Sequence, residues 1–324
     1  MPAPPLSIAV ATETVEAVSR YGSVRAAATA LGVSRSTLQH RYGVARGVLE
    51  NVRAPEPVQG WAHEWGMPAS RDIEITDGTM LVGSDLHIWP ETRTAAWAAF
   101  VGVARELRPD WIVLNGDMID GARVSRHARN PGSKPPKLID EVAALKHALG
   151  ELPEAKRHWC WGNHDQRANS YLAQHAPEAE DYAGNLQDRF PDWPVSWALV
   201  VNGDVEIRHR FCKGIHAAYN NALRSGLTCV TGDTHQLSSR PIDDRRGRRY
   251  GVETGMLGDP AHPAFEYAEG SPNRCAPGFV WLTWCGGVLL PPELAEPVDG
   301  RIWFRGKAWA ASKPRYRVQA GVSA

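Results

Sequence analysis

Two short stretches of this sequence place an aspartate and a histidine two residues apart. Asp85 and His87 form one pair and Asp233 and His235 form the other, and each pair follows a short apolar run. A single pair of this kind is usually a turn in which the carboxylate caps the backbone. Two pairs at the ends of apolar runs indicate a shared role, because carboxylates and imidazoles together bind Mn²⁺, Fe²⁺ or Zn²⁺.

Further polar residues follow other apolar runs. Asp117 follows WIVLNG. The sequence GNHD directly follows the apolar run RHWCW and supplies Asn163, His164 and Asp165. His209 ends the stretch VEIRH. Carboxylate, amide and imidazole groups without cysteine are typical of a site for Mn²⁺, Fe²⁺ or Zn²⁺.

One alternative to His209 lies in the same segment. His216 begins the helical stretch HAAYNNAL, whereas His209 ends a predicted strand. We favour His209, because ligand sites of α/β proteins gather at the carboxyl ends of strands.

The apolar runs alternate with amphipathic stretches, which predicts an α/β fold. Strands are expected over MLVGS, WIVLNG, RHWCWG, VSWALVV, VEIRHRF and LTCVTG, and helices over TAAWAAFVGVAREL and LIDEVAALKHAL. The tail PGFVWLTWCGGVLLPPELAEPVDGRIWFRGKAW alternates apolar and polar residues and predicts antiparallel strands of a second sheet.

The first fifty residues predict a small all-α domain. Thr12 or Thr14 is expected to cap a first helix, Ser23 a second and Ser34 a third, with a tight turn at Gly32. The stretch GSVRAAATALGVSRSTLQHRY resembles a bacterial helix-turn-helix, a motif whose second helix enters the major groove of DNA. The DNA-contacting residues would then be Arg35, Ser36, Thr37, Gln39, His40 and Arg41. The alternative is a helical cap or dimerisation module that does not bind DNA.

Two further segments are polar. Residues 51–72, with three prolines and no strong periodicity, are predicted to form a linker. The stretch GARVSRHARNPGSKPPK carries Arg123, Arg126 and Arg129 and no acid. It either holds an anionic substrate over the neighbouring aspartates or is a solvated basic loop.

The composition is that of a globular protein with a substantial core. Its 36 basic and 36 acidic residues cancel, so overall charge predicts no partner. The five cysteines are scattered and lack C-x-x-C spacing, which favours reduced thiols. We expect a cytoplasmic protein with no membrane association, because no apolar run could span a bilayer and the start does not resemble a signal peptide.

The order D-x-H, G-D-x-x-D, G-N-H-D, H, G-x-x-H over residues 74–310 resembles the calcineurin-like metallophosphoesterase superfamily. The form RHRFCKGIHAAYNNALRSGLTCVTGDTH followed by GMLGDPAHPAFEY is similar to versions found in bacteriophages and prophages. The resemblance implies a sandwich of two mixed sheets flanked by helices. The domains would then be a helix-turn-helix over 1–50, a linker over 51–72 and a metallophosphoesterase over 73–324.

The resemblance also implies a role for each motif residue. Asp85, His87 and His235 would bind a first metal, Asp117 would bridge both metals, and Asn163 and His209 would bind the second. Asp233 stands where the family usually has a histidine of the second site. His164 would lie beside the substrate as a proton donor or charge stabiliser, oriented by Asp165.

The function expected from these features is hydrolysis of a phosphoester with two divalent ions, Mn²⁺ first and Fe²⁺, Mg²⁺ or Zn²⁺ as alternatives. The attached helical motif favours a phosphodiesterase or nuclease that acts on nucleic acid or nucleotides and is tethered to DNA. Two alternatives remain at this point: a DNA-binding regulator with an inactive phosphoesterase fold, and a phosphatase of small monoesters. The sequence leaves the oligomeric state open.

Overall fold

The computed structural model describes residues 8–52, 67–126, 134–179, 183–245, 247–261 and 274–311. The chain divides into two compact units, Met1–Trp61 and Ala62–Ala324. Every helix in the described part of the chain is too short or too polar to cross a lipid bilayer.

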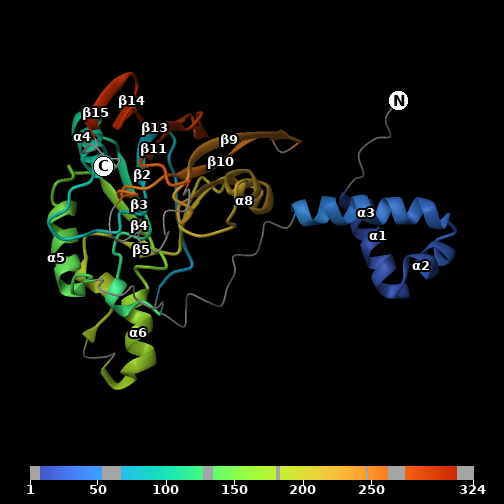
Figure 1. Ribbon diagram of the computed structural model, residues 1–324. Helices are drawn as coiled ribbons and strands as arrows, with labels where there is room; N and C mark the ends of the chain where they lie inside the picture. Colours follow the sequence, from blue (N-terminus) through green and yellow to red (C-terminus); the bar gives the residue numbers. More distant parts are fainter. Residues whose placement is uncertain are drawn as a thin grey trace, which may run out of the picture. The chain divides into compact units, whose positions relative to one another are not determined.

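The first unit contains the helices α1 (Ile8–Tyr21), α2 (Val24–Ala30) and α3 (Arg35–Val52) (Figure 1). Its buried centre consists of Ala17, Val18, Ala27, Ala28 and Leu38. The Ser23 hydroxyl accepts a bond from the Ala26 amide and caps α2, as predicted.

The turn into α3 also follows the prediction. Gly32 has a φ of 66°, which favours glycine, and the Ser34 hydroxyl accepts a bond from the Thr37 amide. The cap predicted for α1 was wrong. Thr14 lies inside that helix, where its hydroxyl donates to the Val10 carbonyl, so α1 begins before both candidate threonines.

The predicted linker over residues 51–72 is too long at both ends. Its first two residues belong to α3, and residues 53–66 lie outside the described part. Met67 is buried in the core of the second unit, and Ser70–Ile73 form the strand β1. Backbone pairing with a distant strand therefore overrode the polar local composition.

The second unit contains two β-sheets. Over the described residues, one sheet has the order β1 (Ser70–Ile73), β6 (Ala198–Val201), β7 (Val205–Arg208), β8 (Thr228–Thr231), β10 (Gly247–Thr254), β9 (Leu237–Asp244). The other has the order β15 (Lys307–Ala311), β14 (Arg301–Phe304), β13 (Glu293–Val298), β11 (Phe279–Cys285), β2 (Gly78–Gly83), β3 (Trp111–Asn115), β4 (Lys156–Cys160), β5 (Val195–Ser196), and β12 (Val288–Leu289) pairs with β11. Both sheets are mixed, with β2 to β5 parallel and the strands from β11 onward antiparallel to their neighbours.

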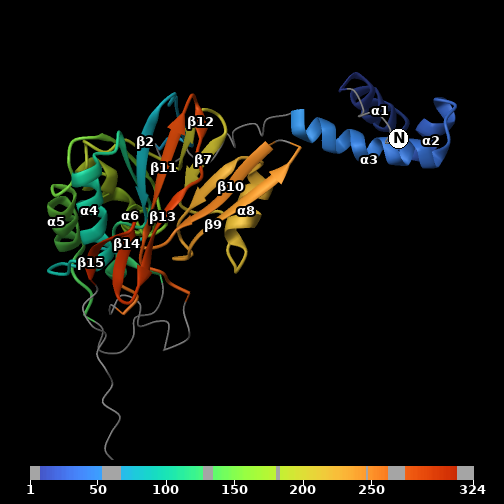
Figure 2. The ribbon, with the colours of Figure 1, turned by 90° about the horizontal axis from the view of Figure 1, so that it is seen from above.

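The alternation of side chains along β2 explains the layers. Met80 and Val82 pack with residues of the other sheet, whereas Leu81 packs with the helices. Helices α4 (Ala95–Leu107) and α5 (Leu138–Leu149) cover the outer face of one sheet, and α8 (Ala217–Ser225) covers the other (Figure 2). The predicted fold, a two-sheet α/β sandwich flanked by helices, is confirmed.

The parallel order β2, β3, β4 brings three carboxyl ends to one edge of the sheet. The strand β7 of the other sheet ends at Arg208, directly before His209. The predicted polar residues therefore follow strands that lie side by side, although they are far apart in the sequence.

Candidate metal centre

The loops that carry the predicted ligands have an unusual backbone. Positive φ angles occur at Asp85 (54°), His87 (44°), Asp117 (53°), Asp233 (66°) and His235 (57°). Each such residue costs about 1–3 kcal/mol and persists only where its surroundings hold it. Here the loops hold one another: the Asp85 amide donates to the Gly116 carbonyl at 2.9 Å and the His87 amide to the Asp117 carbonyl at 3.0 Å.

Asp85, His87 and His235 form a first cluster of possible metal ligands. The Nε2 atoms of the two histidines lie 3.3 Å apart. Asp85 Oδ1 lies 3.2 Å from His235 Nε2 and 3.9 Å from His87 Nε2. All three side chains are buried, so one carboxylate oxygen and two imidazole nitrogens converge on one point.

Asp85, Asp117 and His209 form a second cluster. His209 Nε2 lies 3.1 Å from Asp117 Oδ2 and 4.0 Å from Asp85 Oδ1. The two clusters share Asp85, whereas the predicted bridging residue Asp117 belongs to the second alone. The alternative ligand His216 is exposed at the start of α8, outside both clusters.

A partner on the other ring nitrogen orients each imidazole. His87 Nδ1 lies 3.3 Å from Asp120 Oδ1, and His209 Nδ1 lies 2.6 Å from the Asn115 carbonyl oxygen. Such partners occupy Nδ1 and turn Nε2 toward the cluster, the arrangement found around metal-bound histidines. His235 Nδ1 lies 3.4 Å from Cys275 Sγ.

Glycines allow the loops to approach one another. A Cβ on Gly162 would lie 2.2 Å from Asp117 Oδ1, and one on Gly116 would lie 2.4 Å from the ring of His209. Each glycine directly precedes a predicted ligand, Asp117 or Asn163. A side chain at either position would prevent the neighbouring loops from packing against each other.

The donor atoms fit divalent ions. Three buried polar atoms of these motifs make no regular hydrogen bond: Asn163 Oδ1, and also Asp85 Oδ1 and His209 Nε2, whose nearest polar neighbours are the His235 and Asp117 side chains of their own clusters. An unpaired buried polar atom costs about 1–3 kcal/mol, and metal coordination would satisfy all three. Carboxylate, amide and imidazole donors suit Mn²⁺, Fe²⁺ or Zn²⁺.

Comparison with known proteins agrees with this centre. A family model described as calcineurin-like phosphoesterase matches residues 79–237, which span all the ligands of the two clusters. This region is a calcineurin-like phosphoesterase domain. The predicted resemblance is thereby confirmed, and the protein is a phosphoric ester hydrolase of a metal-dependent family.

The relatives of this phosphoesterase include phage proteins. The chain is 25% identical over 237 residues to the Gene 54 protein of Mycobacterium phage L5, covering 65% of this chain and 91% of the relative. It is 27% identical over 240 residues to the Gene 54 protein of Mycobacterium phage D29, with the same two coverages. Among solved structures, the phosphoesterase Yfce from E. coli matches at 12% identity and a TM-score of 0.31, covering 66% of this chain and 97% of that one.

Asp233 lies outside both clusters of possible metal ligands. Its carboxylate lies 2.8 Å from Lys213 Nζ and 3.5 Å from Arg210 Nε. Its partners in this structure are thus two cations, and the predicted contact of Asp233 with a second metal stays a prediction. The inactive alternative depended on Asp233, and the two clusters of possible ligands form without that residue.

The predicted role of Asp165 was also wrong. Its carboxylate does not face His164 but accepts five N–H groups, at 2.9–3.2 Å, from the amides of Asp117, Met118, Ile119 and Gly162 and from the Trp159 indole. Three of these amides belong to consecutive residues, and the first of them, Asp117, has a positive φ. Asp165 therefore shapes the loop after β3 and acts on the centre through it.

Replacing Asp165 by asparagine is expected to destabilise the phosphoesterase by about 3–5 kcal/mol, because the new amide NH₂ would face N–H donors in a fully buried site. Chemical denaturation measures the change. D188N is the matched control, since exposed Asp188 accepts one backbone bond at 2.9 Å. A D165N effect no larger than that of D188N would contradict the role.

His164 is held by two other residues. Its Nδ1 lies 3.2 Å from Asp120 Oδ1 and 3.0 Å from the Asp120 carbonyl oxygen, and its Nε2 lies 2.8 Å from an Arg167 guanidinium nitrogen. A guanidinium only donates, so Nε2 accepts and Nδ1 carries the proton toward Asp120. Burial lowers the pKa of His164, in agreement with a neutral ring.

Sequence reasoning missed the residues that support the ligands. Asp120 contacts both His87 and His164, and Arg167 also donates to the Asp120 carbonyl at 2.7 Å. Buried Glu141 accepts from the amides of Asp120 and Gly121 at 3.1 and 2.8 Å, and burial raises its pKa to about 8. Only Asp120 carried a signal, the second carboxylate of G-D-x-x-D.

The charges of the centre change the titration of its histidines. Burial opposes a proton on His87, but its bonds to Asp120 and Asp85 outweigh burial and raise its pKa to about 9. The same balance between burial and nearby carboxylates raises the pKa of His209 and that of His235 to about 10. Without metal, the surrounding carboxylates therefore favour the protonated form of these histidines.

Metal binding is expected to release protons and to become tighter between pH 7 and pH 9. A ligand imidazole must be neutral, and raising the pH removes the proton that the metal would otherwise displace. Titration calorimetry with Mn²⁺ in two buffers of different ionisation enthalpy measures the release. H216Q should release as many protons as the natural chain, and a heat that does not depend on the buffer would contradict the prediction.

The predicted basic loop is only partly described. Arg123 follows the centre on a short 3₁₀ helix (Ala122–Val124), and its Nε donates to the Pro135 carbonyl at 2.9 Å. Arg126 is exposed, and Arg129 lies outside the described residues. Contact of these arginines with a substrate stays a prediction.

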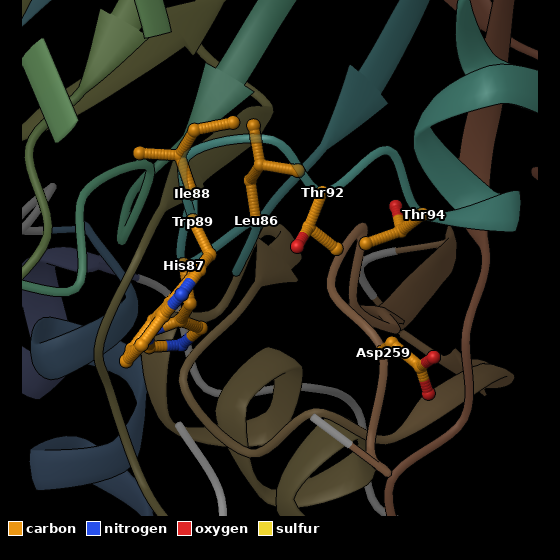
Figure 3. Close-up of a pocket in the computed structure, with 7 residues that line it drawn as sticks. All are labelled: Leu86, His87, Ile88, Trp89, Thr92, Thr94 and Asp259. Atoms are coloured by element: carbon orange, nitrogen blue, oxygen red, sulfur yellow. The ribbon is translucent and has the colours of Figure 1, made fainter. Parts of the chain in front are cut away.

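A small pocket adjoins the first cluster. In Figure 3, His87 and Trp89 lie on one side of it, and Thr92, Thr94 and Asp259 lie on the other. Leu86 and Ile88 complete its lining. His87 thus belongs both to the first cluster and to the lining of this pocket.

Proposed function

We propose that this protein is a two-metal phosphodiesterase that acts on nucleic acid or nucleotides and that its N-terminal unit brings it to DNA. The observation that carries the catalytic part is the pair of clusters that share Asp85, together with the buried Asp85 Oδ1 and His209 Nε2 atoms, which make no regular hydrogen bond. Asp85, His87 and His235 would hold one ion, and Asp117, Asn163 and His209 the other. Bound ions would supply Lewis acidity toward the phosphoryl oxygens and an acidified water for attack.

The chain itself supplies the groups on the leaving side. His164 Nε2 lies 3.8 Å from Asp117 Oδ2, so the ring borders the second cluster. Arg167 brings a permanent positive charge to the same atom of His164. We infer that Arg167 moves from His164 Nε2 to a phosphoryl oxygen of the substrate. Nε2 then takes up a proton from water, Asp120 on Nδ1 stabilises the resulting imidazolium, and Nε2 passes that proton to the departing oxygen.

The choice of Mn²⁺ follows from the donors. Three carboxylate or amide oxygens and three imidazole nitrogens form an intermediate set, between the oxygen shell of Mg²⁺ and the sulfur-rich shell of many Zn²⁺ sites. We propose Mn²⁺ as the ion and compare it with Fe²⁺, Mg²⁺ and Zn²⁺ in the assays below.

A hydrolysis panel tests the reaction. The substrates are bis-(p-nitrophenyl) phosphate, p-nitrophenyl phosphate, nucleotides, and single- and double-stranded DNA, each with the four metals. The proposal requires metal-dependent cleavage of the diester and of at least one nucleic-acid substrate. Turnover of monoesters alone would instead make the protein a small-molecule phosphatase.

The N-terminal unit supports the DNA part of the proposal. Arg35, Gln39 and Arg41 are exposed on α3, whereas Leu38 on the same helix is buried. Ser36, Thr37 and His40 are exposed as well. Arginine reads guanine and glutamine reads adenine, so this face suits the major groove. If DNA is its partner, we propose that the protein works in the cytoplasm, where bacterial and phage DNA is located.

Deleting residues 1–50 is expected to leave turnover of bis-(p-nitrophenyl) phosphate intact and to weaken duplex DNA binding at least about tenfold at moderate salt. Losing phosphate contacts should also make the dependence of affinity on salt shallower. Fluorescence anisotropy at several salt concentrations measures both.

A point variant refines the deletion. R35Q should weaken duplex binding, and R20Q, which changes an exposed arginine at the end of α1, should not. Unchanged duplex affinity after the deletion would refute DNA binding by this unit and leave the phosphodiesterase proposal standing.

A further inference from the structure

Two cations beside the metal centre converge on one carboxylate. Lys213 Nζ and Arg210 Nε lie 2.8 and 3.5 Å from the Asp233 carboxylate. The side chains of Arg210 and Lys213 are 54% and 60% exposed, while that of Asp233 is 8% exposed. One buried carboxylate thus holds two half-exposed cations at the surface, and one positive charge remains in excess.

The backbone places these cations next to the reaction site. Arg210 directly follows His209, whose Nε2 lies 3.1 Å from Asp117 Oδ2. The Asp233 amide donates to Asp85 Oδ2 at 3.2 Å. Arg210 is therefore adjacent in sequence to a ligand of the second cluster, and Asp233, the partner of both cations, is bonded to the Asp85 that both clusters share.

The loop that carries the cations is held at two points. The Cys212 amide donates to Asn221 Oδ1 on α8 at 2.9 Å, and Gln236 Nε2 donates to the Gly214 carbonyl at 3.1 Å. Residues 205–233 contain four lysines or arginines and two acids, Glu206, which pairs with Arg208, and Asp233. An anchored loop with a local positive charge is suited to bind an anion, because little order is lost on binding.

We propose that Arg210 and Lys213 form a subsite for a second phosphate of the substrate, the phosphate next to the scissile one along a nucleic-acid strand. The subsite rests on the proposed function, since it presumes a phosphodiester at the metals. The incoming phosphate replaces Asp233 as partner of the cations, and Asp233 keeps them oriented until then. Asp233 therefore acts on substrate binding and not on the metal.

Calorimetric titration of the Mn²⁺-loaded full chain with three nucleotides tests the subsite. Thymidine 3′,5′-bisphosphate carries two phosphates at the spacing of a strand, thymidine 5′-monophosphate carries one, and thymidine 5′-diphosphate carries two that are directly joined. The bisphosphate is expected to bind roughly tenfold more tightly than the monophosphate, as a charge-assisted contact allows. The diphosphate is expected to gain less than the bisphosphate.

Variants assign the gain to the two cations. K213Q and R210Q should each remove most of the preference for the bisphosphate. K307Q is the matched control, because Lys307 is 51% exposed and pairs with Glu106 far from the loop in sequence. D233N should strengthen bisphosphate binding, since it frees both cations, whereas weaker Mn²⁺ binding in D233N would show that Asp233 is a ligand and overturn its assigned role.

Two results would overturn the subsite: a preference for the bisphosphate that is equal in K213Q, R210Q and K307Q, or the absence of a preference in the natural chain. An equal or larger gain with the diphosphate would overturn the assignment to a strand. Turnover of bis-(p-nitrophenyl) phosphate, measured on the same preparation, reports separately on the phosphodiesterase. The two proposals can therefore fail independently.

Discussion

Replacing Asp117 by asparagine is expected to lower kcat for bis-(p-nitrophenyl) phosphate by about a thousandfold or more. Asp117 supplies a buried carboxylate to the second cluster, and the loss of its charge removes several kcal/mol of stabilisation from bound cations. Asparagine retains an oxygen that can accept the bond from the His164 amide, which is 2.8 Å long in the natural chain. The loss should therefore come from the metal centre and not from unfolding.

Three measurements check the Asp117 prediction. Steady-state kinetics gives kcat, elemental analysis gives the metal bound per chain, and circular dichroism reports the fold. D188N, which changes an exposed carboxylate, serves as the control. A D117N protein that retains full turnover and metal content would exclude the second cluster from the reaction.

Replacing His164 by alanine is expected to reduce turnover by about 10²- to 10⁴-fold for a diester with an alkoxide leaving group. The reduction should be much smaller for bis-(p-nitrophenyl) phosphate, because p-nitrophenolate is stable without a proton. The physical basis is the position of the ring, with Asp120 on Nδ1 and Nε2 facing the second cluster and Arg167.

Comparison of the two leaving groups distinguishes proton transfer from positioning. A dinucleotide such as TpT provides the alkoxide, and H216A provides an exposed-histidine control. Equal losses for both substrates would assign His164 a positioning or electrostatic role instead of proton transfer. No loss for either would place His164 outside the reaction.

Much of the fold could be predicted from the local pattern of apolar and polar residues. The apolar runs MLVGS, WIVLNG and RHWCWG form β2, β3 and β4, and the two amphipathic stretches form α4 and α5. Period and composition suffice for such segments, because burial of one face decides their structure. β1 was missed for the opposite reason: it is a polar four-residue edge strand, formed by pairing with β6.

The sequence by itself determined which groups form the centre: an ordered set of motifs after strands gave five residues of the two clusters, together with His164 beside them. Tertiary structure alone decided how those groups are held. Asp120 supports His87 and His164 from 33 and 44 residues away, and Asp165 binds the Asp117 loop.

The same holds for Asp233, which the motif assigned to a metal and the fold assigns to Lys213 and Arg210. The spacing of a motif predicts at which position of the loop after a strand a residue lies. The partner of a buried charge depends instead on which cations and N–H donors the surrounding loops bring within about 3 Å, and that is settled only when the loops pack.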